Sequence, residues 1–257
     1  MRNELRGALR EIECGPQEVL HSTYLSSLAA RYDAENVLLY NVGAAYFRRS
    51  CAAGLRFEAT PRGLPAAPRP TAGEPRHYHR YQPAAWSGGF NYWTSGLEIV
   101  RWDMPCAPLT ATADVASIWH LIKSSAALME VSSGDSPSRF ALRVLIDAPE
   151  WVRFNCAALV KPVFDGIVCA LHVHDGSMLG EVGERLAARL GTDPTKVVGG
   201  LMDDRIAVLG KRRLLWPWRH SVQWNPADDL CLAGELLIRR GQGHTWRLAG
   251  KLLALDP

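Results

Sequence analysis

The sequence predicts an α+β fold with mainly antiparallel sheets and packed helices, and it allows a division into two subdomains. Segments in which polar and apolar residues alternate, as in strands, are mixed with segments of helical period, and the two types do not alternate strictly. The 257 residues fit one large or two small domains, at roughly 150 residues per domain. With 47% apolar and 21% charged residues, the chain is typical of a folded globular protein rather than a disordered or fibrous one.

The first predicted subdomain covers residues 1–132. The apolar run Val37–Tyr40 predicts a buried strand, and with the following helix and strand it indicates a compact βαβ-like unit. Five prolines between Thr60 and Arg76 predict an extended surface loop, a linker or a lid, because proline interrupts both helices and central strands. The predicted elements are helices 4–13 and 17–32, strand 37–40, helix 44–53, strands 55–58, 77–81 and 97–103, and helix 114–128.

A Ser- and Gly-rich break at 132–138 precedes the second predicted subdomain, residues 139–257, which ends in a basic, Trp-rich β tail. For 230–239 two interpretations remain open. The segment is either a strand of a hairpin that turns at 240–243, which we favour, or a helix that starts at Asn225-Pro226. The predicted elements are strand 140–147, helices 162–174 and 178–190, and strands 206–209, 214–218, 230–239 and 245–255.

Several classes of protein are disfavoured. The first residues lack the apolar core of a signal peptide, and no stretch approaches the roughly 20 apolar residues of a membrane span. The six cysteines form no CxxC pair, which predicts reduced thiols in a cytoplasmic protein. The chain contains no phosphate-binding loop, dinucleotide fingerprint or HExxH motif, so we expect neither a cofactor nor a metal ion.

One helical stripe carries candidate catalytic groups. In the predicted helix that starts at Pro162, Asp165, Val168 and His172 gather on one face together with Lys161. A lysine, a carboxylate and an imidazole in line predict an acid–base array facing a cleft, with Lys161 orienting Asp165 or holding a backbone carbonyl. The alternative is a solvated face with a weak Lys–Asp pair.

A second candidate group lies in the strand His77–Tyr81, where alternation places His77, His79 and Tyr81 on one face. His79 and Tyr81 are candidates for proton transfer near neutral pH. Aromatic packing on a sheet face is an equally good explanation. A metal site shared with the second HxH pair, His172 and His174, is disfavoured because helical residues two apart point in opposite directions.

Basic and aromatic residues concentrate between Arg205 and Trp224. Arginine beside tryptophan suits stacking and the binding of phosphates or carboxylates, so an acidic peptide or a single-stranded nucleic acid could bind here. The formal net charge of only +3 makes nucleic acid the less favoured partner. The alternative is a basic hairpin with tryptophans in the core. The candidate binding residues are Arg212, Arg213, Trp216, Trp218, Arg219 and Trp224.

Four side chains with oxygen atoms, Asn225, Asp228, Asp229 and Glu235, suggest a cation site. We favour the alternative of a capped turn, because Asn-Pro-Ala-Asp (225–228) is common turn chemistry.

Several phrases together resemble the enzymes that form the central pyridine of thiopeptide antibiotics. The phrases are ENVLLYNVG (35–43), GLRFE (54–58), His77–Tyr81, LVKP (159–162) with Asp165-Gly166, and VQWNPADD (222–229). This likeness covers about a third of the chain and contains no defined motif, so no catalytic residue of that family is carried over. It implies a fold related to the glutamate-elimination domains of lantibiotic dehydratases. It also implies a cofactor-free formal aza-[4+2] cycloaddition between two dehydroalanines of a modified precursor peptide, followed by loss of water and of the leader peptide.

The sequence thus predicts a cofactor-free, peptide-modifying enzyme of natural-product biosynthesis. Its candidate catalytic residues are His79, Tyr81, Lys161, Asp165 and His172, and the Arg/Trp segment would bind the leader peptide. The alternative from another class is a non-catalytic binding module that uses the Arg/Trp segment for nucleic acid or an acidic partner. The oligomeric state is left open.

Overall fold

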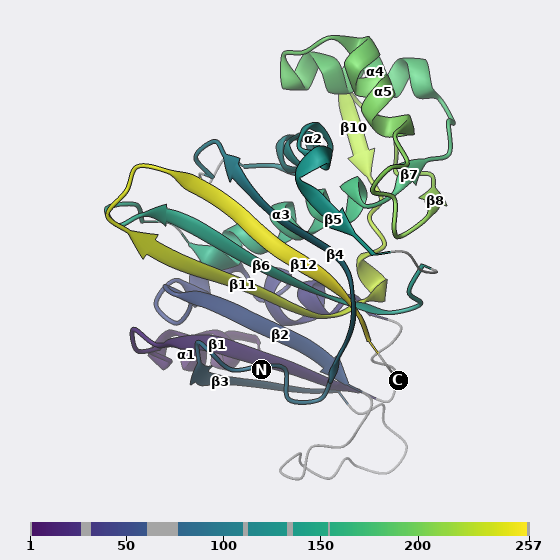
Figure 1. Ribbon diagram of the computed structural model, residues 1–257. Helices are drawn as coiled ribbons and strands as arrows, with labels where there is room; N and C mark the ends of the chain where they lie inside the picture. Colours follow the sequence, from purple (N-terminus) through teal and green to yellow (C-terminus); the bar gives the residue numbers. More distant parts are fainter. Residues whose placement is uncertain are drawn as a thin grey trace.

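The computed structural model describes residues 2–26, 32–60, 77–109, 113–132, 136–153 and 155–255. An eight-stranded sheet with the order β3-β1-β2-β11-β6-β12-β4-β5 forms the body of the protein, and helices cover one face of it (Figure 1). Five of the seven neighbouring strand pairs are antiparallel, and two are parallel. The predicted α+β class with mainly antiparallel pairing is therefore confirmed.

The strands of this sheet come from both predicted subdomains, 1–132 and 139–257. They are β1 (Glu18–Ser26), β2 (Gly54–Thr60), β3 (His77–Ala85), β4 (Ser95–Cys106), β5 (Met129–Val131), β6 (Phe140–Pro149), β11 (Cys231–Gly241) and β12 (Trp246–Leu255). Apart from Thr60, the predicted proline-rich loop lies outside the described residues.

The helices are short and separated by turns. They are α1 (Arg2–Glu11), α2 (Val115–Ser124), α3 (Cys156–Ala170), α4 (Leu179–Leu190) and α5 (Pro194–Met202). Helices α4 and α5 lie beyond α2 at one end of the molecule, at the top of Figure 1, beside a hairpin of β9 (Leu215–Trp218) and β10 (Ser221–Trp224). The two-residue strands β7 (Val173–His174) and β8 (Lys211–Arg212) pair next to them. None of the helices within the described ranges is long and apolar enough to cross a membrane.

The two parallel strand pairs require crossover connections, and these connections carry helices α3 to α5 and two helical turns. Residues 32–53 connect β1 to β2 through a π-helical turn, Asn36–Tyr40 (η2), and a 3-10 turn, Ala44–Phe47 (η3). Helices α3, α4 and α5 lie in the connection from β6 to β11. Both crossovers place polar residues at the same face of the sheet.

The first crossover reverses two predictions. The predicted helix 17–32 is wrong, because Glu18–Ser26 is the strand β1, which is buried between β2 and β3. The predicted strand 37–40 is also wrong, because it is the helical turn η2. The apolar residues of 17–32 fit a helical and a strand period equally poorly, so pairing on both sides of β1 decides its conformation.

Three further predictions in the two crossovers need correction, and one helix was missed. The predicted helix 44–53 is only the 3-10 turn η3, and 206–209 forms turns instead of a strand. Helix α3 begins at Cys156, capped by the Asn155 side chain, so Pro162 lies inside it, and it ends at Ala170 rather than 174. Helix α5 was not predicted, although Asp193 as N-cap and Pro194 at the first position are its usual sequence signals.

The open alternative at 230–239 is settled in favour of the strand β11. The predicted hairpin with the following strand is wrong, however, because β6 lies between β11 and β12 in the sheet. Each of the two strands satisfies its backbone groups along β6, one in parallel and the other antiparallel.

The two faces of the sheet differ in chemistry. On the helix-covered face, Phe57, Leu142, Val144 and Leu252 belong to the main hydrophobic core. On the opposite face, polar side chains form ion pairs such as His21 Nε2 to Glu58 Oε1 at 2.7 Å and Arg56 to Glu235. The segment 86–94 covers these buried pairs: Gly88 O accepts from Arg56 Nη2, and Glu58 accepts from the backbone N–H groups of Asn91 and Tyr92.

Candidate functional site

A lysine surrounded by carboxylates lies on the helix-covered side of the sheet. The Nζ atom of Lys161 is 3.3 Å from Asp165 Oδ2, 3.4 Å from Asp228 Oδ2, 3.5 Å from Glu35 Oε2 and 3.9 Å from Asp33 Oδ2. Four acidic side chains therefore share one cation. We call these five residues the Lys161 cluster.

Three segments that are far apart in the sequence supply the cluster. Lys161 and Asp165 are one turn apart on α3, an i, i+4 spacing that puts them on the same helix face. Asp33 and Glu35 immediately precede η2, where Asp33 Oδ1 accepts from the backbone N–H of Asn36 at 3.1 Å. Asp228 begins the 3-10 turn that leads into β11. The two crossovers thus bring the acids of both halves of the chain onto α3.

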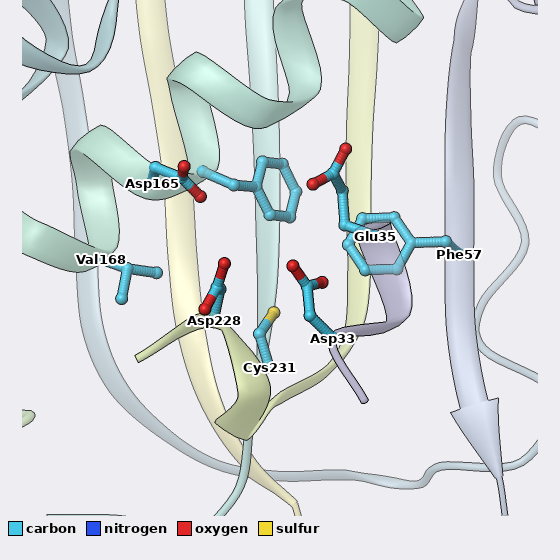
Figure 2. Close-up of a pocket in the computed structure, with 8 residues that line it drawn as sticks. Asp33, Glu35, Phe57, Asp165, Val168, Asp228 and Cys231 are labelled. Carbon is cyan, nitrogen blue, oxygen red and sulfur yellow. The ribbon is translucent and has the colours of Figure 1, made fainter. Parts of the chain in front are cut away.

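A small enclosed cavity of about 10 Å³ lies among these carboxylates, with room for about one water molecule. Figure 2 shows the carboxyl groups of Asp165, Glu35, Asp33 and Asp228 arranged around it. The rest of the wall is apolar and includes Phe57, Phe164, Val168 and Cys231.

The apolar wall depends on a glycine in β11. A Cβ atom at Gly234 would overlap the rings of both Phe57 and Phe164, so the absence of a side chain lets the two rings pack 5.5 Å apart, centroid to centroid. Their packing keeps bulk water from the inner side of the cluster.

The outer side of the cluster opens into a surface groove of about 590 Å³. Glu35 and Asp165 line both the cavity and the groove, so they are the groups of the cluster that a bound molecule could reach from either side. Tyr40 lines the groove with its side chain 65% exposed, and its ring centroid is 5.9 Å from Lys161 Nζ.

Pro162 adds an acceptor to the groove wall. Because proline has no N–H group, the carbonyl of Ala158 lacks its usual α-helical donor, and both residues line the groove. The groove therefore combines carboxylates, a backbone carbonyl and an exposed aromatic ring.

Burial and mutual repulsion raise the pKa values of three acids in the cluster. Burial raises the pKa of Glu35 to about 8, despite the attraction of Lys161, and repulsion by Asp33 and Asp165 adds to the rise. Burial raises the pKa of Asp165 to about 6, with Lys161 opposing and Asp228 reinforcing the shift. Burial and the neighbouring Asp228 raise the pKa of Asp33 to about 7.

The pKa of Lys161 shifts in the direction opposite to that of an isolated buried amine. Burial alone would lower the pKa of Lys161, but attraction to Asp165, Glu35, Asp33 and Asp228 outweighs burial and raises it. The ammonium is therefore charged throughout the physiological range. At neutral pH the cluster holds a protonated Glu35 and an ionised Asp165 beside this fixed cation, which is the arrangement of a general acid and a general base.

Of the predicted catalytic residues, the structure brings together Lys161 and Asp165. His172 lies after the end of α3, buried, with its Nδ1 donating to Val168 O at 2.7 Å and its carbonyl accepting from Lys123. Burial lowers its pKa to about 4, reinforced by Arg212 and Lys123. His172 lines neither the cavity nor the groove.

His79 and Tyr81 lie on the edge strand β3 and also line neither space. The ring of His79 packs edge-on against Tyr24, with centroids 5.4 Å apart, and burial lowers its pKa. The hydroxyl of Tyr81 donates to Leu38 O at 2.8 Å, and burial raises its pKa. In this structure, Tyr81 holds the turn η2 that carries the groove residue Tyr40.

The predicted Arg/Trp residues lie together on and beside the hairpin β9–β10. Arg213 stacks over Trp216 and Arg219 over Trp218, each with the guanidinium carbon 5.8 Å from a ring centroid. Trp218 is 53% exposed.

Two other members of that set have different surroundings. Trp224 packs against Trp119 of α2, with centroids 5.9 Å apart. The half-buried Arg212 lies in β8, where its carbonyl accepts from the Asp175 N–H. Within the described ranges, Arg212, Arg213 and Arg219 form no ion pair, unlike the neighbouring Arg185, which pairs with Glu181.

Sequence reasoning did not identify Asp33 or Glu35 as site residues, and it assigned Asp228 to a cation site or, as favoured, to a capped turn. No local signal marks the first two, since each acid is separated from α3 by more than a hundred residues. In the part of the chain that the structure describes, no set of three His, Cys, Asp or Glu side chains is arranged to hold a metal ion.

No protein-family model matches the chain, and neither a curated protein nor a solved structure is detectably similar to it.

Proposed function

We propose that this protein is an acid–base enzyme that modifies a peptide without a cofactor, and that the Lys161 cluster is its catalytic centre. The observation that carries the proposal is a half-buried ammonium held by four carboxylates next to an open groove. Buried acids with pKa values moved apart are characteristic of catalytic sites, where one must donate a proton and another accept it.

Each group has a distinct role in this proposal. Glu35, protonated at neutral pH, donates a proton to the substrate, and Asp165, ionised at the same pH, accepts one. Lys161 remains charged and orients both carboxyl groups. The Ala158 carbonyl and the ring of Tyr40 position the substrate in the groove.

The resemblance to thiopeptide pyridine-forming enzymes suggests the reaction. Formation of a pyridine from two dehydroalanines, with loss of water and of the leader peptide, requires proton transfers at carbon, nitrogen and oxygen. The proposed substrate is therefore a modified precursor peptide that still carries its leader.

The hairpin β9–β10 is the proposed binding surface for the leader peptide. Arg213 and Arg219 have no carboxylate partner among the described residues and each lies over an indole ring, an arrangement suited to acidic side chains. All six cysteines are free thiols, which supports the cytoplasm as the compartment.

A synthetic peptide with a leader and two dehydroalanines tests the proposal. We expect mass spectrometry to show loss of water and of the leader after incubation with the protein, and no conversion with Lys161→Met or Glu35→Gln. Lys251→Met is the matched control, because it removes the same charge from an ion pair with Glu98 outside the cluster. If Lys161→Met and the control converted the peptide equally, the cluster would not be the catalytic centre.

If the unsubstituted protein binds the leader but leaves the peptide unchanged, the chain is a binding module that uses the hairpin. The hairpin variant Arg213→Gln with Arg219→Gln then weakens binding, whereas Lys161→Met does not.

A further inference from the structure

A second large hollow, open to solvent like the groove of the Lys161 cluster, lies between α2 and α5; we call it the α2–α5 cavity. Its volume is about 560 Å³, within the usual range for small-molecule sites. The walls come from the C-terminal half of α2, the middle of α5 and the segment after α5. Nearly all polar side chains on these walls are hydrogen-bond donors.

A buried lysine lies in the wall of this cavity. The side chain of Lys123 is only 6% exposed, and its ammonium donates to His172 O at 3.1 Å and to Asp203 O at 2.8 Å. An ammonium has three N–H donors, so these two carbonyls leave one donor without an acceptor among the described residues. Burial lowers the pKa of Lys123 to about 8. Arg205 reinforces this shift, and the weaker attraction of Asp203 and Asp204 does not reverse it.

An indole N–H is also unsatisfied here. Trp119 is 1% exposed, and its Nε1 atom has no hydrogen-bond partner in the described structure. The ring edge that carries Cζ2 and Cη2 faces Gly200, within 3.5 and 3.2 Å of the position that a Cβ atom there would take. The Nε1 atom is itself buried, so this unsatisfied donor is out of direct reach of a ligand in the cavity.

The other charged side chains on the cavity wall favour the binding of an anion. Lys196 and Arg205 line the cavity, and the one carboxylate on its wall, Asp203, is already held by the guanidinium of Arg205 at 2.8 and 2.9 Å. Lys196 forms no ion pair with any described residue.

Two consecutive glycines keep the space open. A Cβ atom at Gly199 would meet nothing within 4 Å, and one at Gly200 would press on Trp119. A glycine within a helix costs about 1 kcal/mol relative to alanine, so α5 loses helix stability where it lines the cavity.

We propose that the cavity between α2 and α5 is a second binding site, which takes a small ligand bearing a phosphate or carboxylate group. The ligand's anionic oxygens would accept from Lys123 and Lys196, and its remaining atoms would lie over the glycines. The site is independent of the proposed reaction, since none of its wall residues belongs to the Lys161 cluster.

Isothermal titration calorimetry at low ionic strength tests this site with three probes: phenyl phosphate, benzoate and the neutral benzyl alcohol. We expect at least one anion to bind and benzyl alcohol not to bind. The comparison between phenyl phosphate and benzoate identifies the preferred group. Lys196→Gln should weaken binding about tenfold, the effect of one charge-assisted hydrogen bond.

Two further variants extend the test. Lys123→Met removes the buried ammonium, and its folding is checked by thermal denaturation. Gly199→Leu fills the open space from an exposed helix position, so it should abolish binding without destabilising α5. The exposed Lys196 keeps the test decisive if Lys123→Met fails to fold.

Lys211→Gln is the matched control, because it removes the same charge from β8, outside the cavity. Absence of binding by both anions at millimolar concentration would overturn the proposal. It would equally be overturned if Lys196→Gln left binding intact while Lys211→Gln or Arg213→Gln weakened it, because the anion would then bind near the hairpin.

Discussion

The two ends of α2 border two hollows, one whose charged side chains are mainly acidic and one whose charged side chains are mainly basic. At its start, Asp114 and Val115 line the groove of the Lys161 cluster, whereas Trp119 and Lys123 line the cavity against α5. Each hollow contains one lysine whose side chain is largely withdrawn from water. Carboxylates surround Lys161 and raise its pKa, while Lys123 meets only backbone carbonyls and its pKa falls to about 8.

This comparison shows that burial alone does not determine how a lysine behaves. Burial disfavours the charged form of both amines, and only nearby negative charge reverses the effect. We therefore expect the two lysines to respond in opposite ways to substitution and to pH.

The largest expected effect on stability is that of Lys161→Met. Removing the cation leaves repelling carboxylates together, so the free energy of unfolding at pH 8 should fall by about 3 kcal/mol. This is the lower end of the range for broken buried ion pairs, because Lys161 is 27% exposed. Urea denaturation measures the loss. It should shrink at pH 5, where the acids are protonated, and Lys251→Met should change stability little at either pH. A loss that is the same at pH 5 and pH 8 would contradict the charge argument.

The next effect is the dependence of stability on pH. Glu35, Asp33 and Asp165 have raised pKa values in the folded protein, so the folded state holds protons that the unfolded state has released. Their contribution to stability is present below pH 4 and is lost as the pH rises to about 8. Glu35→Gln should flatten this slope when urea denaturation is followed from pH 4 to pH 8.

The contribution of Lys123 to stability changes with pH in the opposite direction. Its pKa is lowered on folding, so its contribution is complete above about pH 10.5 and is lost as the pH falls to about 8. Stability attributable to this group therefore rises with pH in that window. Lys123→Met should remove this rise, at a cost of about 1–3 kcal/mol near pH 7 for the two carbonyls left without a donor. A steeper rise in the variant would refute the assignment.

The smallest effect on stability is expected at the hairpin. Arg213→Gln with Arg219→Gln should change the free energy of unfolding by less than about 0.5 kcal/mol, because these exposed guanidiniums have no ion-pair partner among the described residues. Binding of an acidic leader peptide, followed by fluorescence anisotropy, should weaken and lose part of its salt dependence. Arg239→Gln is the control, since that arginine pairs with Asp147 on β6. Equal weakening in the control would indicate general charge attraction instead of a defined surface.

The elements that sequence reasoning placed well are those with local signals. Helix α4 and strands β6 and β12 have clear periods and begin and end close to the predicted residues. The exchange of helix and strand in 17–40 has a different origin. Glu18–Ser26 lies between two neighbouring strands, and its backbone hydrogen bonds with them outweigh a weak helical pattern.

The site residues likewise fall into those with a local sequence signal and those without one. Lys161 and Asp165 are recognisable as a pair because they are four residues apart on one helix. Asp33, Glu35 and Asp228 reach them only through the two parallel crossovers, and no short-range pattern encodes that approach.

By itself, the sequence determined the α+β class, the Lys161–Asp165 pair and the concentration of arginine and tryptophan in one segment. These properties follow from residues close together in the chain, which a periodic pattern or a composition count can detect. Tertiary structure alone decided which strands pair, which acids surround Lys161 and which donors surround the cavity at α5. Burial and electrostatic repulsion act through space, so the protonation states that favour catalysis arise only when distant segments pack together.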